Sequence, residues 1–209
     1  MKKSFGFIVL AAGQSRRFGS NKLLLPVQSS PANDDVQPMI VYIAKKLHTL
    51  SPRVLVVSRL EDSALHQTLD THQIAHVSSP TSTQGMGHSL AFGIQQTADW
   101  DGWLICLGDM PFIQTQTYQS MMTALEHHTL VAPVYQGEIG KPVGFAKCFY
   151  QELIQLQGDQ GARSLLNNHS TQLHRVTSND PGILLNIDQP EHLERLKSIA
   201  APVILPLFS

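Results

Sequence analysis

The sequence predicts an α/β fold in which helices cover both faces of a mostly parallel sheet. Short apolar runs alternate with amphipathic stretches of helical length, and this alternation is typical of strand–helix–strand units. The chain has 209 residues, of which 42% are hydrophobic, enough for one domain with a substantial core. We therefore expect a single three-layer domain over residues 1–209.

The expected elements follow in chain order. Four apolar runs predict strands: Phe5–Ala11, Val54–Ser58, Trp103–Asp109 and Thr129–Tyr135. Three amphipathic stretches between them predict helices: Glu61–Leu69, Ser89–Thr97 and Thr115–His127. Val27–Pro38 is rich in proline and small polar residues, which predicts an exposed loop before a helix that begins near Met39. Right-handed connections would bring the carboxyl ends of the strands to one edge, where ligands bind in open α/β sheets.

The pattern changes in the last third of the chain. Residues 133–182 contain two glycine-rich stretches, GEIGKPVGF and GDQGARSLL, and a helical stretch from Cys148. They predict a cap region on the substrate side of the sheet. The stretch LLNIDQPEHLERL then predicts a strand that turns into a helix, with Pro190 in the first helical turn.

Charge and cysteine content narrow the class of protein. A net charge of −1 without blocks of like charge argues against nucleic-acid binding through bulk charge. No apolar run reaches the roughly 20 residues that cross a bilayer. Lys2 and Lys3 before FGFIVLAAG could begin a signal peptide, but the run lacks a small-x-small cleavage site and equally predicts a buried parallel strand. Cys106 and Cys148 form no metal spacing or disulfide framework, so we expect a cytoplasmic protein.

The stretch from Leu10 to Pro26, LAAGQSRRFGSNKLLLP, indicates a phosphate-binding loop at the end of the first strand. Gly13 lets the backbone approach a ligand closely, and Arg17 and Lys22 supply positive charge that suits a polyphosphate. The glycine spacing fits neither the dinucleotide fingerprint nor the P-loop. A dehydrogenase and a P-loop ATPase are therefore not supported.

This loop resembles the signature L-A-A-G-x-S-x-R-F-G-x-x-K of the nucleotidyltransferases that activate sugar phosphates, isoprenoid precursors and molybdopterin. Later stretches are similar, in the same order, to motifs of the molybdenum cofactor cytidylyltransferase branch: GMGHSLAFGI, LGDMPFI, GKPVGF, GDQGARSLL and NIDQPEHL. The resemblance implies a Rossmann-like, GT-A-type nucleotidyltransferase domain. It also implies transfer of CMP from CTP to the terminal phosphate of molybdopterin-bound molybdenum, with release of pyrophosphate.

The resemblance implies three groups of site residues. Those expected to bind the nucleotide or the acceptor are Leu10, Ala11, Ala12, Gly13, Arg17, Lys22, Gly85, Ser89, Asp159 and Arg163. Those expected to be catalytic are Arg17, Lys22 and Asp109. Asp109 and Asp188 each follow an apolar strand and are expected to share a Mg²⁺ ion. Either could instead cap the following helix, and Asp159 with Arg163 could be a surface helix cap beside a solvated arginine.

Some positions depart from the pattern of this branch. Lys141 stands where histidine is usual, Ser79 and Ser82 where an asparagine and an aromatic residue are expected, and Asn186 where an aspartate is expected. Gln28–Gln37 looks like an insertion, which we expect to be a dispensable surface loop. Two alternatives stay open: a guanylyl- or other nucleotidyltransferase with another phosphorylated acceptor, and a non-catalytic carrier that delivers the finished cofactor to a molybdenum-dependent apo-enzyme.

Overall fold

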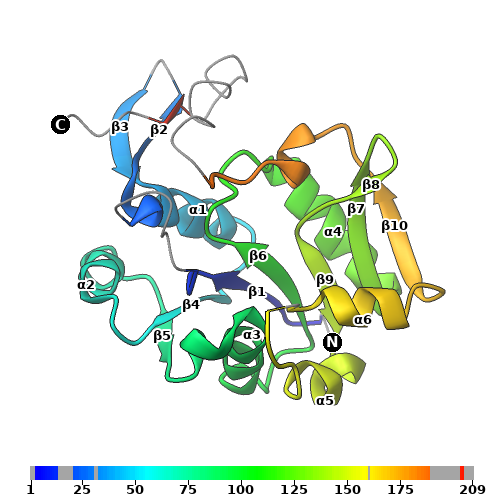
Figure 1. Cartoon of the computed structure of the whole chain (residues 1–209). Coiled ribbons are helices and arrows are strands. Elements are labelled where there is room, and N and C mark those ends of the chain that lie inside the picture. Colours follow the sequence, from blue (N-terminus) through cyan, green and yellow to red (C-terminus); the bar gives the residue numbers. More distant parts are fainter. Residues whose placement is uncertain (1–2, 14–20, 31–32, 160, 189–202, 205–209) are drawn as a thin grey trace.

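A computed structural model describes residues 3–13, 21–30, 33–159, 161–188 and 203–204. Its centre is a sheet with the strand order β10-β7-β9-β6-β1-β4-β5, to which β8 adds by pairing with β7 (Figure 1). The strands of this sheet are β1 Phe5–Leu10, β4 Val54–Arg59, β5 His76–Ser79, β6 Gly102–Leu107, β7 Leu130–Tyr135, β8 Glu138–Ile139, β9 Val143–Ala146 and β10 Leu173–Thr177. Most neighbouring pairs are parallel, whereas β9 runs antiparallel to β6 and β7.

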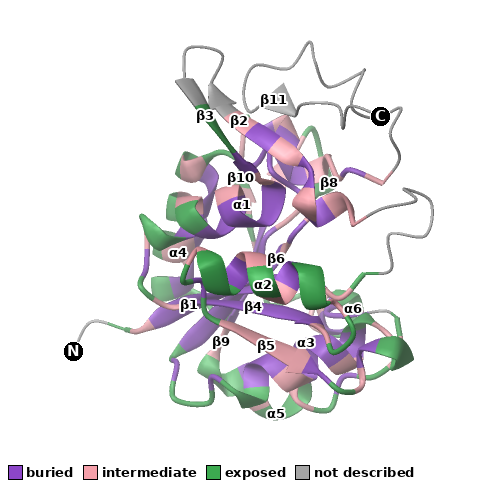
Figure 2. Cartoon of the chain, turned by 90° about the vertical axis from the view of Figure 1, so that its left-hand side faces the viewer, coloured by how far each residue is buried: buried purple, intermediate pink, exposed green. Residues whose placement is uncertain are grey.

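Helices cover both faces of the sheet. The α-helices are α1 Met39–His48, α2 Ser63–Thr71, α3 Met86–Gln95, α4 Thr115–His127, α5 Tyr150–Leu153 and α6 Arg163–Asn168. Short 3-10 turns lie at η1 Lys22–Leu24, η2 Ser82–Gln84, η3 Lys147–Phe149 and η4 Pro181–Leu184. Side chains of α1, α2 and α4 join one apolar cluster, and those of α3, α5 and α6 join another. Buried residues accordingly concentrate along the sheet between these layers (Figure 2).

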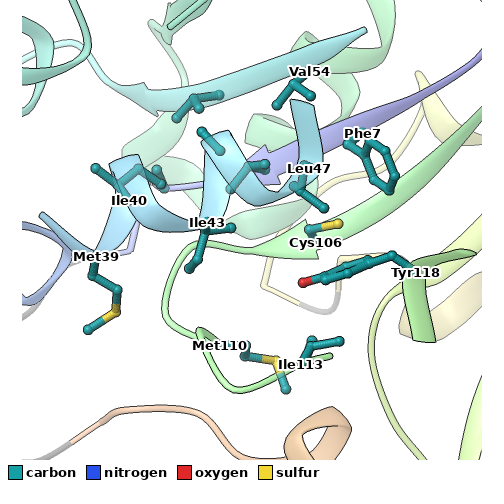
Figure 3. Packing of buried hydrophobic residues seen from close by; sticks show 14 of the residues in the cluster. Phe7, Met39, Ile40, Ile43, Leu47, Val54, Cys106, Met110, Ile113 and Tyr118 are labelled. Atoms are coloured by element: carbon teal, nitrogen blue, oxygen red, sulfur yellow. The ribbon is translucent and has the colours of Figure 1, made fainter. Parts of the chain in front are cut away.

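The central strand β1 feeds both clusters because successive side chains of a strand point to opposite faces. Phe7 and Val9 join the cluster beneath α1 and α4, while Ile8 and Leu10 join the cluster beneath α3. Figure 3 shows the apolar side of α1 directed toward Phe7 and Tyr118, and these two rings meet edge to face with centroids 5.9 Å apart. A strand buried on both faces explains why its sequence is an unbroken apolar run.

The predicted strands and helices occur close to their expected bounds. Helix α2 begins at Ser63 rather than Glu61, because the Asp62 side chain caps it by accepting from Leu65 N. Helix α3 begins at Met86, three residues before the expected start, after Gly85 turns the chain. Among the described helices, none is long and apolar enough to cross a membrane.

The prediction of a loop at Val27–Pro38 is wrong. Strands β2 (Pro26–Ser30) and β3 (Asn33–Pro38) form a hairpin, and β11 (Val203–Ile204) adds to β2, giving a separate antiparallel sheet. Val27 is fully buried in it. Pro26 and Pro38 lie opposite each other at one end of the ladder, where a missing backbone N–H costs little. The segment is therefore a paired hairpin whose ends are packed at Val27 and Gln37, while Asp35 and Val36 are exposed.

Two further expectations need correction. Residues 133–182 do not form a separate cap, because β9 and β10 within them are strands of the central sheet. The turn around Gly158 reaches the amino end of α3, where Gly87 N donates to Gly158 O. The strand expected near residues 184–188 is absent from the described chain there, which forms η4 and then irregular backbone. The helix expected from Pro190 lies outside the described residues.

Candidate active site

A cavity of about 670 Å³ opens at the carboxyl ends of β1 and β6, the edge at which ligands bind in open α/β sheets. Most of the residues expected from the sequence line it: Leu10, Ala11, Ala12, Gly13, Lys22, Gly85, Ser89, Asp109, Asp159 and Asp188. Arg17 lies outside the described residues. Arg163 is described but does not line this cavity; it is the exposed first residue of α6.

Lys22 enters the cavity from the short turn η1. Asn21 caps this turn by accepting from Leu23 N at 3.1 Å, and Leu23 is buried below it. Asn21 is in turn fixed by Asp62 before α2, because its amide donates to Asp62 Oδ2 at 2.7 Å. The lysine therefore stands on a short, capped turn that is tied to a neighbouring helix.

Two carboxylates converge on the Lys22 ammonium. Its Nζ lies 2.7 Å from Asp109 Oδ2 and 2.9 Å from Asp188 Oδ1. Burial alone would lower the pKa of Lys22, but the charges and hydrogen bonds of Asp109 and Asp188 outweigh it and raise this pKa above 10.5. Lys22 is therefore an ammonium throughout the physiological range of pH.

Asp109 is the more enclosed carboxylate, with its side chain 18% exposed against 43% for Asp188. Its Oδ1 is buried and has no hydrogen-bond partner among the described residues. A buried carboxylate oxygen without a donor is costly and indicates a position that a ligand completes. Within the described part of the chain, this side chain accepts from Lys22 and from no backbone N–H, so the structure gives no support to a helix-capping role. The helix that Asp188 would cap lies outside the described residues.

Asp188 is oriented by two neighbours. Asn186 Nδ2 donates to its Oδ2 at 2.6 Å, and Ile187 N donates to Asp109 O at 3.0 Å. The second bond places the two carboxylate-bearing segments side by side. Within the described residues, no group of three or more His, Cys, Asp and Glu side chains gathers as a metal site. Asp109 and Asp188, which share the Lys22 ammonium, are called the acidic pair below.

The amino end of α3 forms another wall of the cavity. Gly85 turns the chain with φ +121°, and a Cβ there would lie 2.4 Å from Gly158 O, so only glycine fits. Ser89, in the first turn, is 1% exposed, and its hydroxyl has no partner among the residues the structure describes. Asp159 lies beside Gly85. This wall presents a buried hydroxyl and the start of a helix to whatever enters the cavity.

Lys141 and Arg163 carry positive charge and do not line this cavity. Burial lowers the pKa of Lys141, and the nearby Arg163 charge lowers it further. The two cations therefore lie close enough to repel each other.

Sequence reasoning missed several cavity residues. Leu23, Thr83 and Leu107 also line the cavity; Leu23 and Thr83 follow Lys22 and Ser82, and Leu107 lies within the predicted strand Trp103–Asp109. Asn186 was noted only as a departure from an acidic motif, although its position two residues before Asp188 is the signal that could have revealed its role.

This fold and this cavity belong to a known class. The chain matches the MobA-like NTP transferase domain over residues 7–176, so it is a member of that family of nucleotidyltransferases. The expected fold class is thereby confirmed, since solved nucleotidyltransferases share its mostly parallel sheet.

Particular relatives cover nearly the whole chain. The purine catabolism protein PucB of Bacillus subtilis is 27% identical over 201 residues, which span 91% of this chain and 94% of PucB. The structure of Rv0371c from Mycobacterium tuberculosis has a TM-score of 0.76 at 21% identity and covers 94% of this chain and 98% of its own. A nucleotidyl transferase from Methanothermobacter has a TM-score of 0.75 at 19% identity, covering 93% and 96%. Rv0371c has also been solved in complex with manganese, with a TM-score of 0.74 at 20% identity, covering 94% and 100%.

Proposed function

We propose that this protein transfers CMP from CTP to the terminal phosphate of a molybdopterin-type acceptor and releases pyrophosphate. The observation that carries the proposal is the convergence of Lys22, Asp109 and Asp188 at one side of the cavity, opposite the amino end of α3. The order of the motifs along the chain supports the cytidylyl branch of the family.

The reaction does not require a general base to activate the nucleophile. An oxygen of the acceptor phosphate attacks the α-phosphorus of CTP, the new P–O bond forms, and the bond to the β-phosphate oxygen breaks. A phosphate monoester has a second pKa near 6, so this nucleophile is already largely ionised at neutral pH. The protein must instead hold two anions in line and offset their charge. A permanent ammonium on a fixed turn, as at Lys22, suits that task.

The other walls supply binding groups in this proposal. Lys22, together with Arg17, would hold the triphosphate and stabilise the departing pyrophosphate. Gly85 allows close approach of the nucleoside, and the unpartnered Ser89 hydroxyl offers it a hydrogen bond. Asp159, which lines the cavity, would face the phosphorylated acceptor, and Arg163 would contribute positive charge to it.

A divalent cation fits the acidic pair. Asp109 and Asp188 provide hard carboxylate oxygens, the ligands that Mg²⁺ prefers, and one oxygen from each lies within 2.9 Å of a single point, the Lys22 Nζ. The partnerless Asp109 Oδ1 offers a further ligand atom. These two residues would hold the ion, which supplies charge neutralisation at the phosphate oxygens when bound. The manganese complex of Rv0371c is a precedent within the fold.

A nucleotide panel tests the proposal. Purified protein is mixed with Mg²⁺, molybdenum cofactor and each of CTP, GTP, ATP and UTP, and pyrophosphate release is measured, with Asp109→Asn as the inactive control. Release with CTP alone supports the proposal. Release with GTP would assign the guanylyl reaction, and binding of the cofactor without release from any nucleotide would assign the carrier.

A further inference from the structure

Two segments carry the acidic pair, and they are joined at three points. The first is the bond from Ile187 N to Asp109 O. The second is a close contact, since a Cβ on Gly182 would lie only 2.5 Å from Phe112 O. The third is the side chain of Asp180, which reaches back to the start of α4.

Asp180 is a buried carboxylate, only 3% exposed. Its Oδ2 accepts from Gln114 N at 2.8 Å and from Thr117 Oγ1 at 2.7 Å, and its Oδ1 accepts from Gly182 N at 2.9 Å. One side chain thus fixes the end of the segment that follows Asp109 and the start of the segment that leads to Asp188. Charge-assisted bonds of this kind are roughly twice as strong as neutral ones.

Lys46 on α1 also holds the segment after Asp109. Its Nζ donates to Pro111 O at 2.8 Å and to Ile113 O at 2.9 Å. The chain after Asp109 is therefore bonded both to the Lys46 cation and to the Asp180 anion. Neither Lys46 nor Asp180 lines the cavity.

We propose that Asp180 is a positioning residue: through these bonds it sets the separation of Asp109 and Asp188 and thereby the affinity of the site for a divalent cation. The inference rests on the proposed function for its use of the metal. Mg²⁺ demands near-ideal geometry at about 2.0–2.1 Å, so a small shift of one segment against the other misplaces a ligand oxygen. Groups that orient metal ligands typically change metal affinity by about 10- to 100-fold when they are lost.

Binding of Mn²⁺ alone, followed by electron paramagnetic resonance of the free ion, tests the proposal directly. In Asp180→Asn an amide replaces one oxygen and faces an N–H donor. In Gly182→Ala the new methyl group would lie 2.5 Å from Phe112 O and 2.8 Å from Asp180 Oδ1, so it separates the segments and displaces the Asp180 side chain. We expect the Mn²⁺ dissociation constant to rise by about 10-fold or more in both, and the Mg²⁺ concentration needed for half-maximal transfer to rise in parallel.

A matched control lies at the opposite edge of the sheet. Ser51 is 6% exposed, donates to Phe5 O and accepts from Arg53 N, so Ser51→Ala also removes buried hydrogen bonds. We expect thermal stability to fall in this variant while Mn²⁺ affinity stays that of the wild type.

Three outcomes would overturn the assignment of Asp180. They are wild-type Mn²⁺ affinity in folded Asp180→Asn, wild-type Mn²⁺ affinity in Gly182→Ala, and an equal loss of affinity in Ser51→Ala. If Asp180→Asn does not fold, the Mn²⁺ affinities of Gly182→Ala and Thr117→Val decide whether Asp180 is a positioning residue. A wild-type protein that binds Mn²⁺ but releases no pyrophosphate would refute the proposed function alone, because the binding comparison still tests Asp180.

Discussion

Replacement of Lys22 by methionine should change metal binding and catalysis in opposite directions. In the structure the Lys22 ammonium occupies the space between the oxygens of Asp109 and Asp188, at 2.7 and 2.9 Å. A divalent cation at the acidic pair is therefore repelled by this charge. Methionine keeps most of the apolar stem and removes the charge, so the net charge of the three side chains changes from −1 to −2.

The size of the effect follows from Coulomb's law. Two unit charges 4 Å apart interact by about 1 kcal/mol in water, so a divalent ion gains about 2 kcal/mol when one such repulsion is removed. That is about 30-fold in affinity. Transfer should nevertheless fall by about 100-fold or more, since removal of one charge-stabilising donor commonly costs that much. The pKa of Lys22 is raised, so this contrast should persist from about pH 6 to about pH 9.

The assay is Mn²⁺ binding and pyrophosphate release in wild type, Lys22→Met and Lys45→Met. Lys45 lies on the exposed face of α1, so its substitution makes the same change in net charge away from the cavity. Tighter Mn²⁺ binding with slower transfer in Lys22→Met alone is the expected result. Mn²⁺ binding no tighter than in the wild type would refute the claim that Asp109 and Asp188 form the metal site.

The remaining predictions concern the acidic pair, Lys46 and the hairpin. Asp109→Asn should abolish most transfer, and Asp188→Asn should have a smaller effect because its side chain is more exposed (43% against 18%); wild-type activity in Asp109→Asn would overturn the enzyme assignment. Burial lowers the pKa of Lys46 to about 8 from 10.5 in the unfolded chain. Between about pH 8 and pH 10.5 the unfolded state binds more protons than the folded state. The free energy of urea unfolding should therefore rise with pH in wild type relative to Lys46→Met, by at most about 1.4 kcal/mol per pH unit. An equal dependence on pH in the two proteins would contradict the lowered pKa. Replacing residues 28–37 by a short glycine linker should lower the midpoint of thermal unfolding, because it removes most of a paired hairpin. An unchanged midpoint would show that the segment is dispensable, as the sequence predicted.

The sequence was sufficient for four strands of the central sheet, β1, β4, β6 and β7, and for most of the cavity residues, whereas β5, β8, β9 and β10 were not predicted. Strands β1 and β6 are buried on both faces, so their sequences are apolar runs, as is most of β4. Residues that follow the runs of β1 and β6, such as Ala12, Gly13 and Asp109, then had to lie at the carboxyl edge. A local pattern and one rule of topology were enough to bring them together with Lys22.

The features that were missed depend on partners far away in the chain. Strand β11 pairs with β2 of the hairpin, with Val203 opposite Gln28. No pattern in the sequence around the hairpin predicts a partner strand so far along the chain. Asp180 stands in the run S-N-D-P-G, which predicts a turn. Its bonds to Gln114 and Thr117 join positions 66 and 63 residues apart, so its sequence neighbours give no sign of a buried role.

Lys22 and Asp180 stabilise the same arrangement by different means. The two carboxylates of the acidic pair repel each other, and the Lys22 ammonium, which contacts both, offsets this repulsion. The bonds of Asp180 and the contact at Gly182 resist separation of the same two segments mechanically. Loss of either leaves the other to hold the pair, so the two contributions are coupled rather than additive. A site held together in this way keeps its carboxylates in place before the metal arrives, at the cost of competition between the ammonium and the metal for the same oxygens.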